Sequence, residues 1–116
     1  MTEILNRRIL LASRPEGKPG PDNFCLVEEK ILGPEEGWML VRNRFLSLDP
    51  YMRGRMSGVR SYAKPVEVGE VMTGATVGEV LESRHPEFEK GDIVVGRGEW
   101  QEHALLKGEE CRKVDP

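Results

Sequence analysis

Cysteine is scarce in this sequence, and its two thiols stand far apart. Cys25 and Cys111 are the whole complement, and neither belongs to a Cys-x-x-Cys pair or lies at metal-ligand spacing from a histidine. This disfavours a disulfide framework and a structural zinc site, and it favours free thiols in a reducing cytoplasm. Because His85 and His103 are also isolated, we expect no metal site of any kind.

Long apolar runs and an excess of one charge are also lacking. No stretch approaches the roughly 20 apolar residues that cross a bilayer, and residues 1–8 lack the apolar centre of a secretory signal. We therefore expect a cytoplasmic protein with no membrane partner. The 17 basic and 20 acidic residues give a net charge of −3, which suggests no nucleic-acid partner either.

Motifs for self-contained catalysis are absent as well. The sequence has no Gly-x-Gly-x-x-Gly or P-loop pattern for a nucleotide and no Gly-x-Ser-x-Gly elbow for a nucleophile. Its adjacent carboxylates, such as Glu35-Glu36 and Glu109-Glu110, fall at turns where side chains are usually solvated. The residues alone therefore describe a domain without catalytic machinery of its own.

What is present is a chain divided into short strands. Its 116 residues suffice for one domain, and 13 glycines and 8 prolines are dispersed between apolar runs. From Trp38 to Phe45 apolar and polar residues alternate, which predicts a half-buried strand with Met39, Val41, Asn43 and Phe45 on one face. Glycines inside the predicted strand 70–83 indicate a bulge, a bend or a close approach of backbone.

Together these patterns predict a mainly β fold: a small, strongly bent barrel or sandwich with one or two helical turns. The predicted strands follow the apolar runs of the sequence: residues 8–13, 24–30, 38–45, 70–83, 93–96, 100–106 and 111–114. Asp49 followed by Pro50 predicts the start of the helical piece, because Asp favours the N-cap and Pro the first helical position.

The segment Asp49-Pro50-Tyr51-Met52-Arg53 admits two interpretations. It places a phenol, a thioether and a guanidinium on one turn, and Tyr62, the second of two tyrosines, follows in the next loop. A phenol can donate to a carbonyl oxygen while its ring lines an apolar slot, as a ketone or aldehyde pocket requires. In the simpler interpretation, Tyr51 and Met52 are core residues and Arg53 is a solvent-facing cap.

Several motifs resemble the N-terminal part of one enzyme family. That family is the zinc-independent medium-chain dehydrogenase/reductases of the prostaglandin reductase, alkenal double-bond reductase and curcumin reductase branch. The resemblance covers essentially the whole chain, and Asp-Pro-Tyr-Met-Arg is its most specific motif. The segments that carry it are 12–15, 21–24, 46–56, 78–83, 91–94 and 100–102.

The resemblance implies that residues 1–116 form a GroES-like, partly open β-barrel, the substrate-side domain of a two-domain enzyme. Such enzymes use NADPH to reduce the carbon–carbon double bond of α,β-unsaturated ketones or aldehydes. The nucleotide-binding domain and the main catalytic residue would lie outside this chain, so we expect no catalytic residue here and no activity of the chain alone. The full enzyme, an NADP-dependent oxidoreductase acting on CH–CH groups, is expected to be a homodimer whose partners are its enone substrate and its own nucleotide-binding domain.

Carried over to this sequence, the resemblance places Tyr51 and Tyr62 in the substrate cleft and Pro50 and Met52 near the nicotinamide. The zinc-dependent relatives have Gly-His-Glu where this chain has Gly69-Glu70, so the ligand histidine is missing and no zinc is expected. We also expect apolar surface around Tyr51, Met52 and Met56 to be exposed, because a second domain would cover it. The alternative is a free-standing GroES-like binding or assembly module without a redox role.

Overall fold

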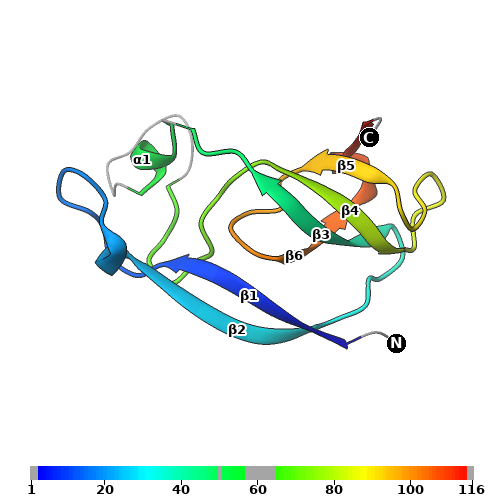
Figure 1. Cartoon of the computed structure of the whole chain (residues 1–116), viewed down its shortest axis with the longest axis horizontal. Coiled ribbons are helices and arrows are strands. Elements are labelled where there is room, and N and C mark those ends of the chain that lie inside the picture. The colour runs from blue at the N-terminus through cyan, green and yellow to red at the C-terminus, as the bar shows by residue number, and fades with distance from the viewer. Residues whose placement is uncertain (1–2, 50, 57–64, 115–116) are drawn as a thin grey trace.

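The computed structural model describes residues 3–49, 51–56 and 65–114. Seven strands, one short α-helix and two 3₁₀ turns make up the described chain (Figure 1). In chain order they are β1 (Glu3–Leu11), η1 (Pro21–Asn23), β2 (Phe24–Leu32), β3 (Trp38–Leu46), α1 (Tyr51–Arg55), β4 (Thr76–Ser83), β5 (Ile93–Gly96), β6 (His103–Lys107), η2 (Gly108–Glu110) and β7 (Arg112–Val114).

The strands form two antiparallel sheets that meet along a seam. Five strands pair in the order β6-β3-β4-β5-β7, while β1 and β2 form a separate hairpin (Figure 1). At the seam the Ile9 amide donates to the Trp100 carbonyl (2.8 Å) and the Met72 amide to the Ile9 carbonyl (3.0 Å). Since backbone pairing continues only partly from one sheet to the other, the fold is the partly open, mainly β barrel that the sequence predicts.

Two apolar clusters fill the interior. The larger sheet buries Met39, Val41, Val80 and Val94. The second cluster lies where α1 meets the end of β1, and its buried members are Leu11, Met52, Met56, Val66 and Met72. Each fully buried side chain of this size contributes roughly 1.5–3 kcal/mol relative to an exposed one. The second cluster therefore holds the single helical turn against the barrel.

Strand β3 departs from the simple alternation expected of it. Its register against β4 shifts between Leu40 and Val41 and again between Asn43 and Phe45. Leu40 is buried, although alternation places it on the polar face, and Phe45 is 70% exposed, although alternation places it in the core. The prediction for both residues is wrong. Phe45 changes face because Arg44 is an extra residue of β3 at the second shift. Leu40 lies before both shifts, so its burial has a different cause.

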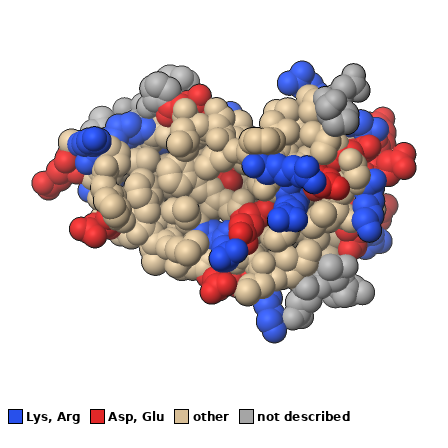
Figure 2. All heavy atoms as spheres, viewed as in Figure 1, with Lys and Arg blue, Asp and Glu red and all other residues tan. Residues whose placement is uncertain are grey.

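Several predicted boundaries are displaced. The described helix begins at Tyr51, next to the predicted first position Pro50, which lies outside the described residues. Strand β1 begins at Glu3, before the predicted 8–13, and β4 begins only at Thr76, so that residues 70–75 form a connection. Both cysteines are free, as predicted, and Cys25 is exposed. Within the described ranges, no helix has the length and apolar character needed to span a membrane. On the face seen in Figure 2, acidic and basic side chains lie side by side, without a large area of one sign.

Candidate functional site

The segment that links β3 to α1 is held by short-range hydrogen bonds. The Ser47 amide donates to the Ala75 carbonyl (3.0 Å), which ties the end of β3 to the connection before β4. The Ser47 hydroxyl donates to the Asp49 carboxylate (2.8 Å), and the Met52 amide donates to the Asp49 main-chain carbonyl (3.1 Å). Asp49 therefore organises the entry to the helix, while a side-chain N-cap by Asp49 stays a prediction.

The residues assigned to substrate and cofactor are only partly within the described structure. Pro50 and Tyr62 lie outside the described residues, and so does the side chain of Tyr51, whose backbone begins α1. Met52 is the one assigned residue whose side chain is placed, and it is 4% exposed in the second cluster. Burial of Met52 is what the simpler interpretation expects, while its role near a nicotinamide stays a prediction.

The expected apolar exposure around the helix is wrong for Met52 and Met56. Both are 4% exposed, because the turn lies over Leu11 and Met72 and closes the second cluster. A single amphipathic turn can bury its apolar face against its own domain as well as against another, and the sequence alone does not distinguish these outcomes.

Exposed apolar side chains gather instead where β3 ends. Phe45 and Leu48 are 70% and 71% exposed, and Leu46 between them is partly exposed. We call these three residues the apolar shelf. A hollow of about 280 Å³ adjoins it. Its lining residues are Phe45, Leu46, Ser47, Ala75, Thr76, Val77 and Val95. Apolar patches of this kind commonly mark contact with another domain or molecule.

Replacing Phe45 with serine should reduce self-association of the chain at high concentration. The substitution removes apolar area from a contact between molecules, whereas it removes nothing from the folded core. Sedimentation equilibrium of wild type and Phe45→Ser measures the effect. Leu5→Ser is the matched control, since Leu5 is about as apolar and is 53% exposed on the hairpin. Equal association of all three proteins would contradict a contact through the shelf.

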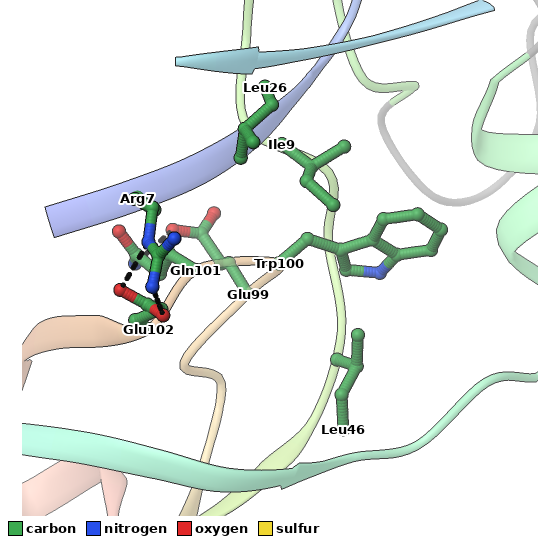
Figure 3. A pocket seen from close by; sticks show the side chains of 8 residues that line it. All are labelled: Arg7, Ile9, Leu26, Leu46, Glu99, Trp100, Gln101 and Glu102. Carbon is green, nitrogen blue, oxygen red and sulfur yellow. Dashed lines mark hydrogen bonds and ion pairs between the residues drawn. The ribbon is translucent and has the colours of Figure 1, made fainter. Parts of the chain in front are cut away.

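A larger hollow, of about 360 Å³, lies at the seam between the sheets (Figure 3). Ile9, Leu26, Leu46 and Trp100 form its apolar wall. Arg7 and Glu102 close its polar end through two hydrogen bonds, Nε–Oε1 at 3.1 Å and Nη2–Oε2 at 2.9 Å. The hollow has the volume of a small-molecule pocket.

A hydrogen-bond network fixes the loop that forms this polar end. Asn6 is 1% exposed; its Nδ2 donates to Gln101 Oε1 (2.9 Å) and its Oδ1 accepts from the His103 amide (2.9 Å). Asn43 Nδ2 donates to the carbonyls of Gln101 (2.9 Å) and Gly98 (3.1 Å). Sequence reasoning missed this network. Its one local signal is the amide of Asn43 on the face of 38–45 that alternation assigns to the core.

Glu99 is held in this loop under two constraints. Its φ of 64° makes it the only non-glycine residue with positive φ in the described chain. Burial raises the pKa of its carboxyl; Arg8 opposes the increase and Glu70 adds to it. Gly98 beside it is also constrained, because a Cβ there would stand 2.3 Å from Thr76 Oγ1. The network therefore holds Glu99 in a conformation that it would not favour alone.

Glu99→Gln should stabilise the chain at pH 7 and have no such effect near pH 4. Because the folded pKa is raised, ionisation opposes folding, and stability is lost as pH rises through that pKa. The uncharged amide avoids this cost, and the gain in the free energy of unfolding should be less than about 1 kcal/mol because the site is partly solvated. Urea unfolding at the two pH values tests the sign. A stabilisation that is independent of pH would show that the charge is not the cause.

The described residues do not fit a metal or a nucleotide. They contain no group of three or more His, Cys, Asp and Glu side chains placed to hold a metal ion. A dinucleotide pyrophosphate usually rests on a glycine-rich turn at the N-terminus of a long helix. Helix α1 has five residues and no such turn before it.

The fold and the matched residues define the class of protein. The family described as the N-terminal domain of oxidoreductases matches residues 7–114, and the chain belongs to it. The NADPH-dependent curcumin reductase of Escherichia coli (strain K12) is 50% identical over 109 residues, which are 94% of this chain and 32% of that protein. The 2-alkenal reductase (NADP(+)-dependent) of Nicotiana tabacum is 36% identical over 108 residues, 90% of this chain and 32% of that protein.

A solved structure supports the same assignment. CurA from Vibrio vulnificus, in complex with NADPH, is 50% identical with a TM-score of 0.87 and covers 92% of this chain, which spans 32% of that chain. Within the oxidoreductases, the chain thus belongs to the medium-chain dehydrogenase/reductase branch that includes the curcumin, alkenal and prostaglandin reductases. It spans about a third of the length of these curated relatives.

Proposed function

We propose that this chain is the substrate-side domain of an NADP(H)-dependent reductase. Its substrates would be α,β-unsaturated ketones or aldehydes, reduced at the carbon–carbon double bond. The observation that carries the proposal is the 50% identity to an NADPH-dependent curcumin reductase over 94% of the chain. The alkenal reductase, whose name indicates an unsaturated aldehyde, supports the same substrate class.

In this proposal the chain supplies binding and orientation, and the cofactor is held by another domain. The phenols of Tyr51 and Tyr62 would line the cleft and donate to the carbonyl oxygen of the substrate, where negative charge develops as the double bond is reduced. Pro50 and Met52 would lie toward the cofactor. The Met52 side chain is buried, so only a small part of its surface would be available to contact the cofactor.

We also propose that the reaction is independent of zinc. Where the zinc-dependent relatives have Gly-His-Glu, this chain has Gly69-Glu70, so the ligand histidine is missing. A catalytic zinc needs about three protein ligands. A cytoplasmic location and a homodimeric full enzyme complete the proposal.

Calorimetric titration with NADPH tests the division between domains. We expect no saturable binding of NADPH by the 116-residue chain at NADPH concentrations below about 1 mM. A dissociation constant of 1 mM corresponds to a binding free energy of about −4 kcal/mol. The same titration of E. coli curcumin reductase is the positive control. Stoichiometric, micromolar binding by the chain would contradict the proposal. The reading frame after Pro116 also separates the reductase from a free-standing module, since a strand, a Gly-x-Gly-x-x-Gly turn and a helix are expected only in the reductase.

A further inference from the structure

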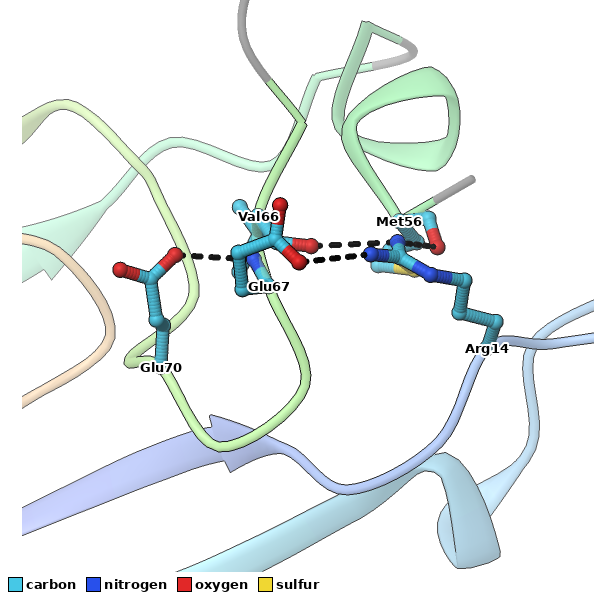
Figure 4. Close-up of polar contacts among 5 residues, drawn as sticks. All are labelled: Arg14, Met56, Val66, Glu67 and Glu70. Atoms are coloured by element: carbon cyan, nitrogen blue, oxygen red, sulfur yellow. Dashed lines mark hydrogen bonds and ion pairs between the residues drawn. The ribbon is translucent and has the colours of Figure 1, made fainter. Parts of the chain in front are cut away.

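Arg14, in the loop after β1, joins two segments that are distant in sequence (Figure 4). Its Nη1 donates to the main-chain carbonyl of Met56 (2.8 Å), immediately after α1, and to that of Val66 (3.1 Å). Its Nη2 lies 3.4 Å from the Glu67 carboxylate. One guanidinium thus bridges the end of the helix and the start of the connection that leads to β4.

Arg53 makes the reciprocal contact from the helix to the loop. Its Nε donates to the carbonyl of Gly17 (2.9 Å) and its Nη2 to that of Pro15 (3.1 Å). The simpler interpretation of the sequence makes Arg53 a solvent-facing cap, but both of these hydrogen bonds are to main-chain carbonyls. Arg14 and Arg53 therefore cross-link the same two segments in opposite directions.

Such cross-links matter because α1 is too short to be stable alone. Isolated helices below about 12–15 residues are marginal in water, and α1 has five residues. Its last carbonyls also lack partners within the helix. Arg14 provides one for Met56, and the Val66 amide provides one for Arg55 (2.7 Å). Hydrogen bonds from a charged donor are stronger than neutral ones, and the planar fork of arginine suits two acceptors at once.

The ion pair with Glu67 does not account for this arrangement. The Glu67 side chain is 58% exposed and the pair is separated by 3.4 Å, so solvent screens the attraction. The two carbonyls that Arg14 contacts belong instead to buried residues, since Met56 and Val66 are both in the second cluster. The main-chain contacts are thus the part of the interaction that is tied to the core.

We propose that Arg14 and Arg53 are positioning residues that fix the helical turn bearing Tyr51 and thereby set the substrate-side wall. They act through the backbone of α1 and of residues 65–67, and no contact of their own with substrate is needed. The assignment of a substrate-side wall rests on the proposed function, whereas the fixing of the turn does not.

Hydrogen exchange of the 116-residue chain tests the fixing of the turn. The amides of Met56 and Val66, which donate within this region, report on the turn, and the Val80 amide, bonded to Asp92 (2.9 Å), reports on the barrel. In Arg14→Met we expect exchange at Met56 and Val66 to accelerate about 10- to 100-fold, as expected for loss of charged hydrogen bonds, while Val80 is unchanged.

Two matched variants separate the contacts of Arg14. Glu67→Gln removes the ion pair alone and should leave exchange at Met56 as in wild type. Arg14→Lys keeps the charge and should restore protection only partly, because an ammonium lacks the planar fork; it also serves as the readout if Arg14→Met does not fold. Unchanged exchange at Met56 and Val66 in both Arg14 variants, or equal acceleration at Val80, would overturn the proposal.

Ligand binding tests the link to the wall. Benzylacetone is a suitable probe because it has the ketone of an enone but no double bond that could alkylate Cys25. In wild type and Glu67→Gln, millimolar benzylacetone should shift the amide resonances of α1, and in Arg14→Lys the half-saturating concentration should rise about 10-fold. If wild type shows no shift, the proposed substrate wall is wrong. The hydrogen-exchange data still test, independently, whether Arg14 fixes the helical turn. Equal affinity of wild type and Arg14→Lys would contradict the positioning role.

Discussion

Replacing Gly78 with alanine should destabilise the chain by about 3 kcal/mol, near the upper end of the cost of overpacking. A Cβ at this position would stand 2.6 Å from both the Arg42 carbonyl oxygen and Val41 Cγ1. The first is main chain and the second belongs to a fully buried side chain, so neither can move cheaply. The residue also pairs with Asn43 directly before the second register shift of β3.

Urea unfolding, followed by the fluorescence of Trp38 and Trp100, measures this loss. Gly20→Ala is the matched control, because its φ is negative and no atom lies within 4 Å of its added Cβ. That variant should be neutral or slightly stabilising, since alanine restricts the unfolded chain. A shift of less than about 1 kcal/mol for Gly78→Ala would mean that β3 relaxes around the methyl group.

Gly78 also shows how far the sequence predicts this fold. A glycine inside a strand indicates a close approach or a bulge from local information alone, and the structure confirms both features. It does not indicate which partner approaches, because Arg42 is 36 residues away. The consequence for Phe45, which moves from the predicted core face to solvent, depends on pairing with β4 and is not visible in the period-two pattern.

In the candidate site, too, local features are predictable from the sequence and long-range contacts are not. Asp49 before Pro50 predicts the start of α1 because capping is a local interaction. Whether Met52 and Met56 then face another domain or their own depends on Leu11 and Met72, which reach the helix only in the folded chain. Asn6 and Gln101 are 95 residues apart, so no sequence spacing indicates the bond between them.

Arg14 illustrates a third case. The Arg-Pro dipeptide carries part of the family resemblance, but neither composition nor periodicity assigns it a task. Its two carbonyl acceptors are main-chain atoms, 42 and 52 residues further along the chain. Main-chain acceptors have no side-chain identity, so no pattern of residue types can reveal them in advance.

Joining this chain to the remainder of a relative should give an active reductase. We expect a chimera in which residues 1–116 replace the matched third of E. coli curcumin reductase to oxidise NADPH with an unsaturated ketone at roughly 1–1,000 s⁻¹, the usual range for enzymes. The isolated chain should give no rate above the uncatalysed reaction. The 50% identity across 94% of the chain makes the exchange of domains feasible.

The apolar shelf provides the control for that experiment. If the nucleotide-binding domain covers Phe45 and Leu48, then Phe45→Asp in the chimera buries an unpaired charge. This substitution should lower kcat/KM at least 10-fold, since such burial costs more than about 1.4 kcal/mol. Leu5→Asp places the same charge at an exposed position of the hairpin and should leave kcat/KM within about 2-fold of the chimera, as surface substitutions usually do. An active chimera that tolerates both substitutions would confirm the reductase and exclude the shelf as its domain contact. A folded chimera that binds NADPH but reduces neither ketone nor aldehyde would exclude the proposed substrate class.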